Sequence, residues 1–126
     1  MAKVNDGVVA EYALATELLK RGYMPHWPSG GAASYDLVVD VNRTAVRIQV
    51  KSTVQDKNIR LRLVSGEKMY TKSHADLLLL WVDAFKTWYV IPIKKIRAKF
   101  ISLKPRSPRC KWAPYKEAWH LLETAC

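Results

Sequence analysis

The stretch that decides the fold is YDLVVDVNRTAVRIQVKST, residues 35–53. It holds two strand-like runs, 35–41 and 45–53, around the turn-forming residues 42–44, and this arrangement predicts an antiparallel hairpin. Alternate side chains of a strand point to opposite faces. One face therefore carries Leu37, Val39, Val41, Val46, Ile48 and Val50, and the other carries Asp36, Asp40, Arg47, Gln49 and Lys51.

The polar face holds the residue types that phosphodiester hydrolysis needs. If the turn is the two residues Asn42 and Arg43, Asp36 lies opposite Gln49, with their Cβ atoms about 5 Å apart. Two oxygen-bearing side chains at that separation can share a metal ion. Lys51 follows on the same face, where a cation beside the attacking water favours its hydroxide form. The pattern thus predicts a hydrolytic metal site.

Gln49 offers only a neutral amide oxygen, so a further carboxylate has to supply negative charge. Glu11 is the best placed donor in the sequence, since it lies in the middle of a predicted helix from Asn5 or Asp6 to about Arg21. Gly22 ends that helix. A flexible loop over 29–34, which includes Ser34, then precedes the hairpin.

The remaining pattern predicts further strands and a last helix. Strands are expected over 59–64, 75–82 and 87–93, and a short helix over 114–124. We therefore expect an α/β fold, with an N-terminal helix on a mixed, mainly antiparallel sheet of about five strands. At 126 residues and 49% hydrophobic content, the chain is predicted to form a single domain, 1–126.

The chain is strongly basic, with a formal net charge of +10. Such a surface attracts polyanions, nucleic acid first and an anionic membrane surface second. The region 94–126 is a basic arm and helix, because nine Lys or Arg and no Asp or Glu lie between positions 94 and 116. Its predicted phosphate contacts are Lys94, Lys95, Arg97, Lys99, Arg106, Arg109 and Lys111. Arg60 and Arg62 are candidates for a DNA groove or the DNA backbone, and Ser52 for the phosphate.

Two cysteines form neither a disulfide framework nor a zinc-type spacing, and the N-terminal residues lack an apolar signal core. The longest apolar run, 77–82, is too short to cross a bilayer. We therefore expect a cytoplasmic protein without a membrane partner.

Several segments resemble the PD-(D/E)XK nucleases. They are GVVAE (7–11), GY (22–23), SYDLVV (34–39) and IQVKST (48–53). Together with ADL (75–77), WYVIP (88–92) and the Trp- and Arg-rich C-terminal arm they cover most of the chain. The resemblance is nearest to the branch related to group I intron homing endonucleases, in which Gln replaces the Glu of the final motif. The archaeal-type Holliday junction resolvases are the second resemblance, although they normally carry Glu at that position. The naming Pro of the motif is Tyr35 here.

The resemblance implies a DNA endonuclease that uses Mg²⁺, with Mn²⁺ as a substitute, on duplex or branched DNA. It implies metal ligation by Asp36 and Gln49, a water-orienting role for Lys51 and an auxiliary metal or water contact by Glu11. A domain with one active site cuts both strands only as a homodimer or larger symmetric assembly, with Leu77–Leu80 or the C-terminal helix as the expected interface. A non-catalytic DNA-binding module and an RNA-binding protein are the alternatives left open by Gln49 and by charge alone.

Overall fold

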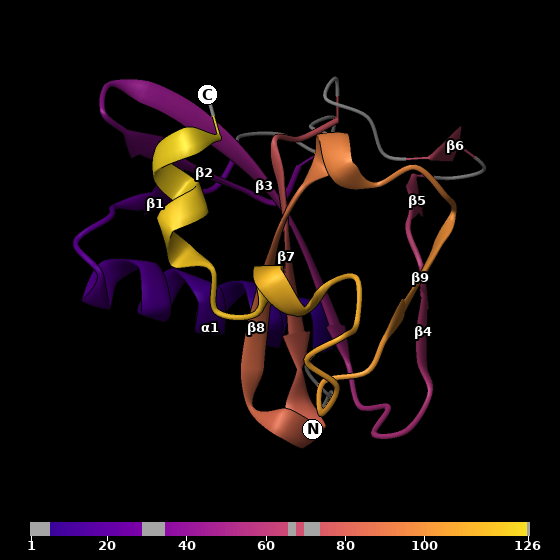
Figure 1. The fold of residues 1–126 in the computed structure, drawn as a ribbon. Helices are drawn as coiled ribbons and strands as arrows, with labels where there is room; N and C mark the ends of the chain where they lie inside the picture. The colour runs from indigo at the N-terminus through magenta and orange to yellow at the C-terminus, as the bar shows by residue number, and fades with distance from the viewer. Residues whose placement is uncertain (1–5, 29–34, 66–67, 70–73, 126) are drawn as a thin grey trace.

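The computed structural model describes residues 6–28, 35–65, 68–69 and 74–125. Its centre is a five-stranded sheet in which neighbours run antiparallel, except for the parallel pair β3 and β7. Figure 1 shows this sheet between α1 and the C-terminal segment on one side and a small two-stranded ribbon on the other. The strand order is β1 (Pro25–His26), β2 (Leu37–Val41), β3 (Thr44–Thr53), β7 (Leu77–Val82) and β8 (Thr87–Pro92).

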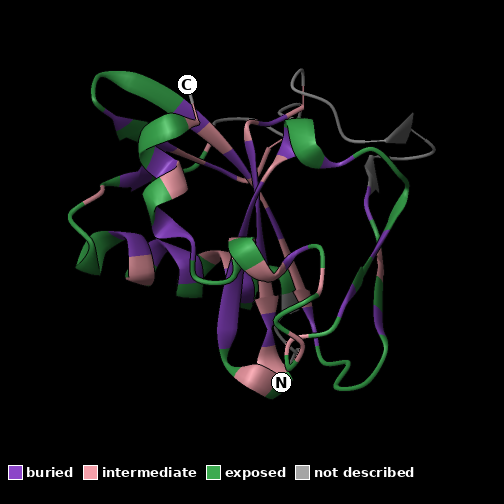
Figure 2. Cartoon of the chain, in the orientation of Figure 1, coloured by how far each residue is buried: buried purple, intermediate pink, exposed green. Residues whose placement is uncertain are grey.

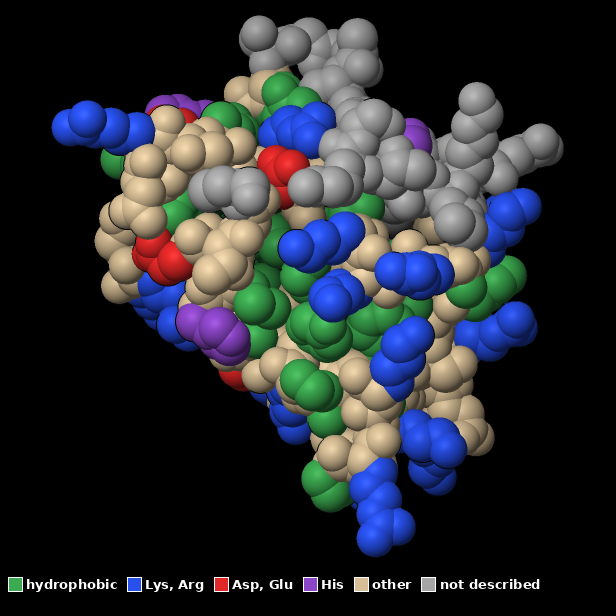
Figure 3. Space-filling model, turned by 45° about the horizontal axis from the view of Figure 1, so that its top comes forward, with side chains coloured by type: hydrophobic (Ala, Val, Ile, Leu, Met, Phe, Trp, Pro, Cys, Tyr) green, Lys and Arg blue, Asp and Glu red, His purple; other side chains and the backbone are tan. Residues whose placement is uncertain are grey.

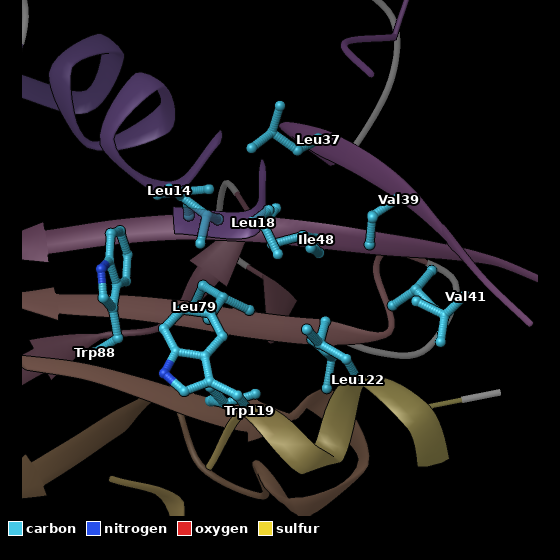
Figure 4. Packing of buried hydrophobic residues seen from close by; sticks show 14 of the residues in the cluster. Leu14, Leu18, Leu37, Val39, Val41, Ile48, Leu79, Trp88, Trp119 and Leu122 are labelled. Carbon is cyan, nitrogen blue, oxygen red and sulfur yellow. The ribbon is translucent and has the colours of Figure 1, made fainter. Parts of the chain in front are cut away.

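The first face of the sheet is covered by α1 (Asp6–Lys20) and η4 (Trp119–Thr124). Helix α1 turns its apolar stripe of Ala10, Leu14 and Leu18 inward because these side chains recur every four residues. They meet the predicted apolar face of the β2–β3 hairpin, every member of which is buried. Figure 4 shows Leu122 and Trp119 completing this core from η4.

The second face of the sheet is covered by a ribbon of β4 (Ile59–Arg62) and β9 (Phe100–Leu103), which pair antiparallel. Its inner residues Ile59, Ile101 and Leu103 pack with Leu78 and Leu80 of β7. Buried and exposed residues alternate along β9 (Figure 2), so this ribbon keeps one face for the core and one for solvent.

Short elements complete the chain. A second small hairpin joins β5 and β6, and three single 3-10 turns connect or follow the main strands. Among the described residues, no helix is long and apolar enough to cross a membrane. The bounds are β5 (Val64–Ser65), β6 (Lys68–Met69), η1 (Asp83–Phe85), η2 (Ile93–Lys95) and η3 (Ala113–Tyr115).

The expected helix, hairpin and five-stranded mixed sheet are confirmed, but the membership of the sheet differs. Residues 25–26 pair with β2, whereas the predicted strand 59–64 leaves the sheet and pairs with β9 inside the basic arm. Sequence periodicity finds strands without choosing their partners, and this pairing joins segments about forty residues apart.

The C-terminal helix is present as 3-10 turns rather than one continuous helix over 114–124. Glu117 interrupts it with a φ of 50°, and the Glu117 carboxylate accepts hydrogen bonds from the Trp88 amide (2.5 Å) and the Trp119 indole (3.0 Å). These contacts tie the segment to β8. The expected interface at Leu77–Leu80 is wrong, because all four leucines are fully buried within the monomer. Trp119 and Leu122 are likewise part of the core.

Candidate active site

The β2–β3 hairpin has the register that the two-residue turn predicts. Asn42 and Arg43 take positive φ angles of 51° and 69°, the combination found in tight type I′ hairpin turns. Leu37 therefore pairs with Ile48, and the Asp36 amide donates to the Ile48 carbonyl at 2.9 Å. Asp36 lies just before β2 and faces Gln49, so the predicted pairing is confirmed.

Asp36 is held by two hydrogen bonds from β3. Its Oδ2 accepts from the Gln49 side-chain amide and from the Val50 backbone N–H, each at 2.8 Å. Both donors hold the carboxylate against the strand, and one of them, the Val50 N–H, is a backbone group whose position the strand fixes. Gln49 can instead present its amide oxygen if the group turns by half a rotation, because an amide carries a donor and an acceptor on one carbon.

The Asp36 carboxyl has a pKa raised above its ordinary value. Burial of the half-buried side chain is the main cause, and the Val50 hydrogen bond and the nearby Lys51 ammonium oppose it. Desolvation disfavours a charged carboxylate, whereas a donor and a cation favour it. Asp36 is thus a carboxylate in a poorly hydrated place, and a nearby cation stabilises its charged form.

Glu11 reaches the same locality from α1. The pKa of its carboxyl is raised first by burial and second by the negative charge of Asp36, while a hydrogen bond from the Trp27 side chain opposes both. Trp27 in turn packs against Tyr12, with ring centroids 5.2 Å apart and ring planes inclined by 36°. The negative charge of Asp36 thus opposes ionisation of Glu11, and a divalent cation between two carboxylates relieves such repulsion.

The donor set around Asp36 fits a hard divalent cation. Two carboxylates and one amide supply only oxygen ligands, which Mg²⁺ prefers. Among the described residues, no three His, Cys, Asp or Glu side chains gather as a metal site. Gln49, which is a neutral amide, is not among the residue types of such a group. The site is therefore suited to Mg²⁺ in chemistry but carries less negative charge than a three-carboxylate cage.

An ion pair between Arg47 in β3 and Asp76, the residue before β7, holds these two strands together. Asp76 accepts from the Arg47 backbone N–H (2.9 Å) and from its guanidinium (3.2 Å to Nη2), and the Asp76 amide donates back to the Arg47 carbonyl at 2.9 Å. Neither Asp76 nor Trp27 was among the site residues predicted from the sequence. An aspartate placed directly before the buried run 77–82 was the available signal for Asp76.

The remaining predicted site residues are placed differently. Lys51 is half-buried on the face of Gln49, and it pairs in register with Leu80 of β7. Ser52 lies on the opposite, α1 side of β3, where it lines a hollow with Ala13. Ser34 lies outside the described residues. Asp40 is near the hairpin turn, 4.0 Å from the imidazole of His26 and largely exposed.

The predicted DNA-binding cations are all exposed. Figure 3 shows one face of the molecule, on which Lys and Arg side chains are spread mainly over the half where β4 and β9 run, with few acidic side chains among them. The ion pairs of the described residues use other cations, namely Arg21, His26, Arg47 and Lys86. The exposed set comprises Arg60, Arg62, Lys94, Lys95, Arg97, Lys99, Arg106, Arg109 and Lys111.

Comparison with known proteins gives one family match and two informative structures. The family model described as PD-(D/E)XK endonuclease matches residues 1–122. A bacterial homing endonuclease, I-Ssp6803I, is 27% identical, with a TM-score of 0.78 over 94% of this chain and 90% of that one. No match was found among curated proteins.

The second structure is Hjc, a Holliday junction resolvase from the archaeal hyperthermophile Archaeoglobus fulgidus. It is 21% identical to this chain, with a TM-score of 0.57, and the match covers 79% of this chain and 84% of the resolvase. At that identity the likeness concerns the fold. Both resemblances inferred from the sequence motifs therefore recur at the level of structure.

Proposed function

The chain belongs to the PD-(D/E)XK endonuclease family, and on that basis we propose that it cuts duplex DNA in a metal-dependent reaction at Asp36, Gln49, Lys51 and Glu11. The observation that carries the proposal is the fixed pairing of Asp36 with Gln49, with Lys51 following on the same face of β3. Glu11 brings a second carboxylate to this end of the sheet.

Asp36, Glu11 and the Gln49 amide oxygen would hold the metal. A bound Mg²⁺, for which Mn²⁺ would substitute, supplies Lewis-acid polarisation of the phosphate and a lowered pKa for a bound water. The Asp36 backbone bond and the Val50 N–H orient the Asp36 carboxylate before substrate arrives, and the Gln49 amide turns to offer its oxygen. Such preorganisation lowers the reorganisation cost of the reaction.

Lys51 would act on the water and on the phosphate. Its ammonium lies near enough to Asp36 to lower that carboxyl's pKa, so it stands beside the group that orients the nucleophile. A cation there favours the hydroxide form of the water and offsets charge that develops on the phosphate oxygens. The water oxygen forms a new P–O bond, one ester P–O bond breaks, and the leaving oxygen takes up a proton.

Duplex cleavage of the homing type is the preferred substrate class. It is supported by the fold, by the structural match to the homing endonuclease over most of both chains, and by Gln49 in the final motif. The exposed cations of the arm would position the DNA backbone without reading its sequence. Junction resolution is the alternative, and the substrate panel below separates the two.

A homodimer or larger symmetric assembly would cut both strands, because each chain offers one site. Neither Leu77–Leu80 nor η4 can supply the contact, since their apolar side chains are largely consumed by the core. Exposed apolar residues lie instead on α1, at Val8, Val9, Tyr12 and Leu19. Sedimentation of the protein across a concentration series measures the assembly directly.

The test is cleavage of labelled linear duplex, supercoiled plasmid and four-way junction DNA in Mg²⁺, Mn²⁺ and EDTA. Asp36→Ala and Lys51→Ala are the inactivating variants, and Asp40→Ala is the matched control on the same strand face. We expect metal-dependent cutting that falls at least 100-fold in both inactivating variants and persists in the control.

The substrates then sort the alternatives. Cutting of duplex and plasmid supports the homing-type reaction, and cutting confined to the junction supports a resolvase. Tight binding without cutting in either metal, unchanged by Asp36→Ala, would contradict the catalytic proposal and leave a DNA-binding module on a nuclease fold. Preference for single-stranded or A-form ligands would point to RNA.

A further inference from the structure

The β4–β9 ribbon presents a second polar surface that the cleavage chemistry does not use. On its outer side Arg60 and Arg62 of β4 are exposed, and their register partners on β9 are the exposed Ser102 and Phe100. The inner residues are buried against β7 and β8. We call the set Arg60, Arg62, Phe100 and Ser102 the ribbon face.

Arg60 is prearranged on this ribbon face. Its guanidinium carbon lies 4.0 Å from the Phe100 ring centroid, a cation–π contact that orients the planar fork. Its backbone N–H donates to the Gln55 side-chain oxygen (2.9 Å), and its carbonyl accepts from the Gln55 amide (3.2 Å). Within the described part of the chain, no carboxylate pairs with this guanidinium. Its N–H donors therefore point into solvent from a fixed base.

The charge around the ribbon face favours a polyanion. A hollow of about 300 Å³ beside it is lined by Arg97, Lys111 and Phe100. The carboxylates of Glu117 and Glu123 are hydrogen-bonded to other parts of the fold. Glu117 accepts from the Trp88 backbone N–H, and Glu123 accepts from the Asn42 side-chain amide. Cations that flank an arginine-bearing strand pair in this way suit the phosphates on either side of a DNA groove.

The dimensions of the ribbon match the major groove of B-DNA. That groove is about 12 Å wide and admits a two-stranded β-ribbon, whose strands lie about 4.8 Å apart. There an arginine fork can donate to both acceptors on the guanine edge. We propose that the β4–β9 ribbon enters the major groove and reads bases through Arg60 and Arg62, with Arg97 and Lys111 on flanking phosphates. This inference rests on the proposed function, because it assigns a recognition element to the same DNA substrate.

The ribbon and the candidate active site are mechanically joined. Gln55 holds Arg60 and lies two residues after the end of β3, where the Thr53 hydroxyl accepts a hydrogen bond from the Gln55 backbone N–H at 3.1 Å. The ribbon also packs on Leu78 and Leu80, which are the register partners of Gln49 and Lys51. A duplex bound over Gln49 and Lys51 thus lies on the same face of the sheet as the ribbon. The bases that the ribbon contacts would therefore lie at a fixed distance from the bond that is cut.

The test selects binding sites from a randomised duplex library in EDTA, where cleavage does not interfere. Wild type is compared with Arg60→Ala, Arg60→Lys and Arg62→Ala, and with Arg109→Ala as a control that removes one arm charge. We expect wild type to enrich a motif containing guanine. Arg60→Ala and Arg60→Lys both lose the preference at one position, by about 10- to 100-fold, because Lys lacks the fork. Arg109→Ala binds all sites more weakly and keeps the motif.

Methylation of guanine N7 on the selected site checks the groove, because N7 lies only in the major groove. We expect it to block wild type and not Arg60→Ala. Thermal unfolding checks that each variant is folded. If Arg60→Ala does not fold, Arg60→Lys alone provides the test. An unchanged motif in both Arg60 variants, or binding by wild type without any enriched motif, overturns the inference. Wild-type plasmid cleavage in Mg²⁺ is measured in parallel. Cleavage together with a motif that does not depend on Arg60 contradicts only this inference. A motif that depends on Arg60, without cleavage, contradicts only the proposed catalysis.

Discussion

The two faces of β3 differ although their residues alternate along one strand. Val46 and Ile48 are fully buried against α1, whereas Arg47, Gln49 and Lys51, on the other side, are half-buried and hydrogen-bonded or charged. The first face stabilises the fold through burial of apolar side chains. The second is partly desolvated, which raises the pKa of Asp36. One strand thus separates stability from chemistry by its period of two.

Removing apolar volume from the first face is the strongest way to break this division. Ile48→Ala should lower the free energy of unfolding by about 2–5 kcal/mol, since a fully buried side chain leaves a cavity in the α1 core. Cleavage per folded molecule should hold at low temperature. Urea unfolding and single-turnover cleavage measure the two quantities. A stable but inactive variant would mean that the faces are not separable.

The Arg47–Asp76 pair lies between the two roles. Asp76→Ala removes the acceptor of the Arg47 backbone N–H and leaves a half-buried guanidinium without its carboxylate. We expect a loss of about 1–3 kcal/mol in unfolding free energy, measured in urea. Asp76→Asn should recover part of it, because the amide oxygen still accepts from the backbone. Equal stability of Asp76→Ala and wild type would remove this pair from the account of β3 placement.

A smaller effect concerns pH. Because the folded-state pKa of Asp36 is raised, the folded protein binds its proton more tightly than the unfolded chain does. Stability should therefore fall as pH rises from about 4 through the raised folded-state pKa. Asp36→Asn should flatten this dependence and be the more stable protein above that range. Unfolding of both proteins across the acid range measures the slope, and identical slopes would contradict the assigned burial cost.

Cleavage should respond to pH in the opposite direction. Asp36 and Glu11 have to be ionised to hold a cation, and both pKa values are raised. Activity should then be lost on acidification at a higher pH than for ordinary carboxyls. Cleavage rates at sub-saturating Mg²⁺, where the cation competes with protons for these carboxylates, check this across the acid range. An activity that persists down to the ordinary carboxyl range would count against both ligands.

The hairpin could be predicted from sequence because its evidence is local. Turn residues 42–43 set the register, and the register alone places Asp36 opposite Gln49. The long-range partners could not be predicted. Residues 59–62 pair with 100–103, and Asp76 reaches Arg47, through contacts that no periodicity encodes. Trp27 beside Glu11 is likewise a tertiary contact.

Burial on α1 marks the same limit. Helical spacing alone groups Val9 and Tyr12 with Leu14 and Leu18, but in the structure Val9 and Tyr12 are exposed. A stripe of apolar residues shows that a helix is amphipathic, while the neighbouring sheet decides how wide a part of the stripe is covered. The hairpin residues of the candidate site and Glu11 could therefore be proposed from the sequence, whereas the tertiary contacts of Trp27 and Asp76 could not.

The most direct measurement of the central claim is Mn²⁺ binding without DNA, followed by the electron paramagnetic resonance signal of the unbound ion. Wild type, Asp36→Asn and the control Asp40→Asn are compared, since Asp40 lies on the same strand but is largely exposed near the turn. We predict that Asp36→Asn weakens binding at least tenfold while Asp40→Asn leaves it unchanged. Equal affinity in Asp36→Asn and wild type would contradict a metal site at Asp36.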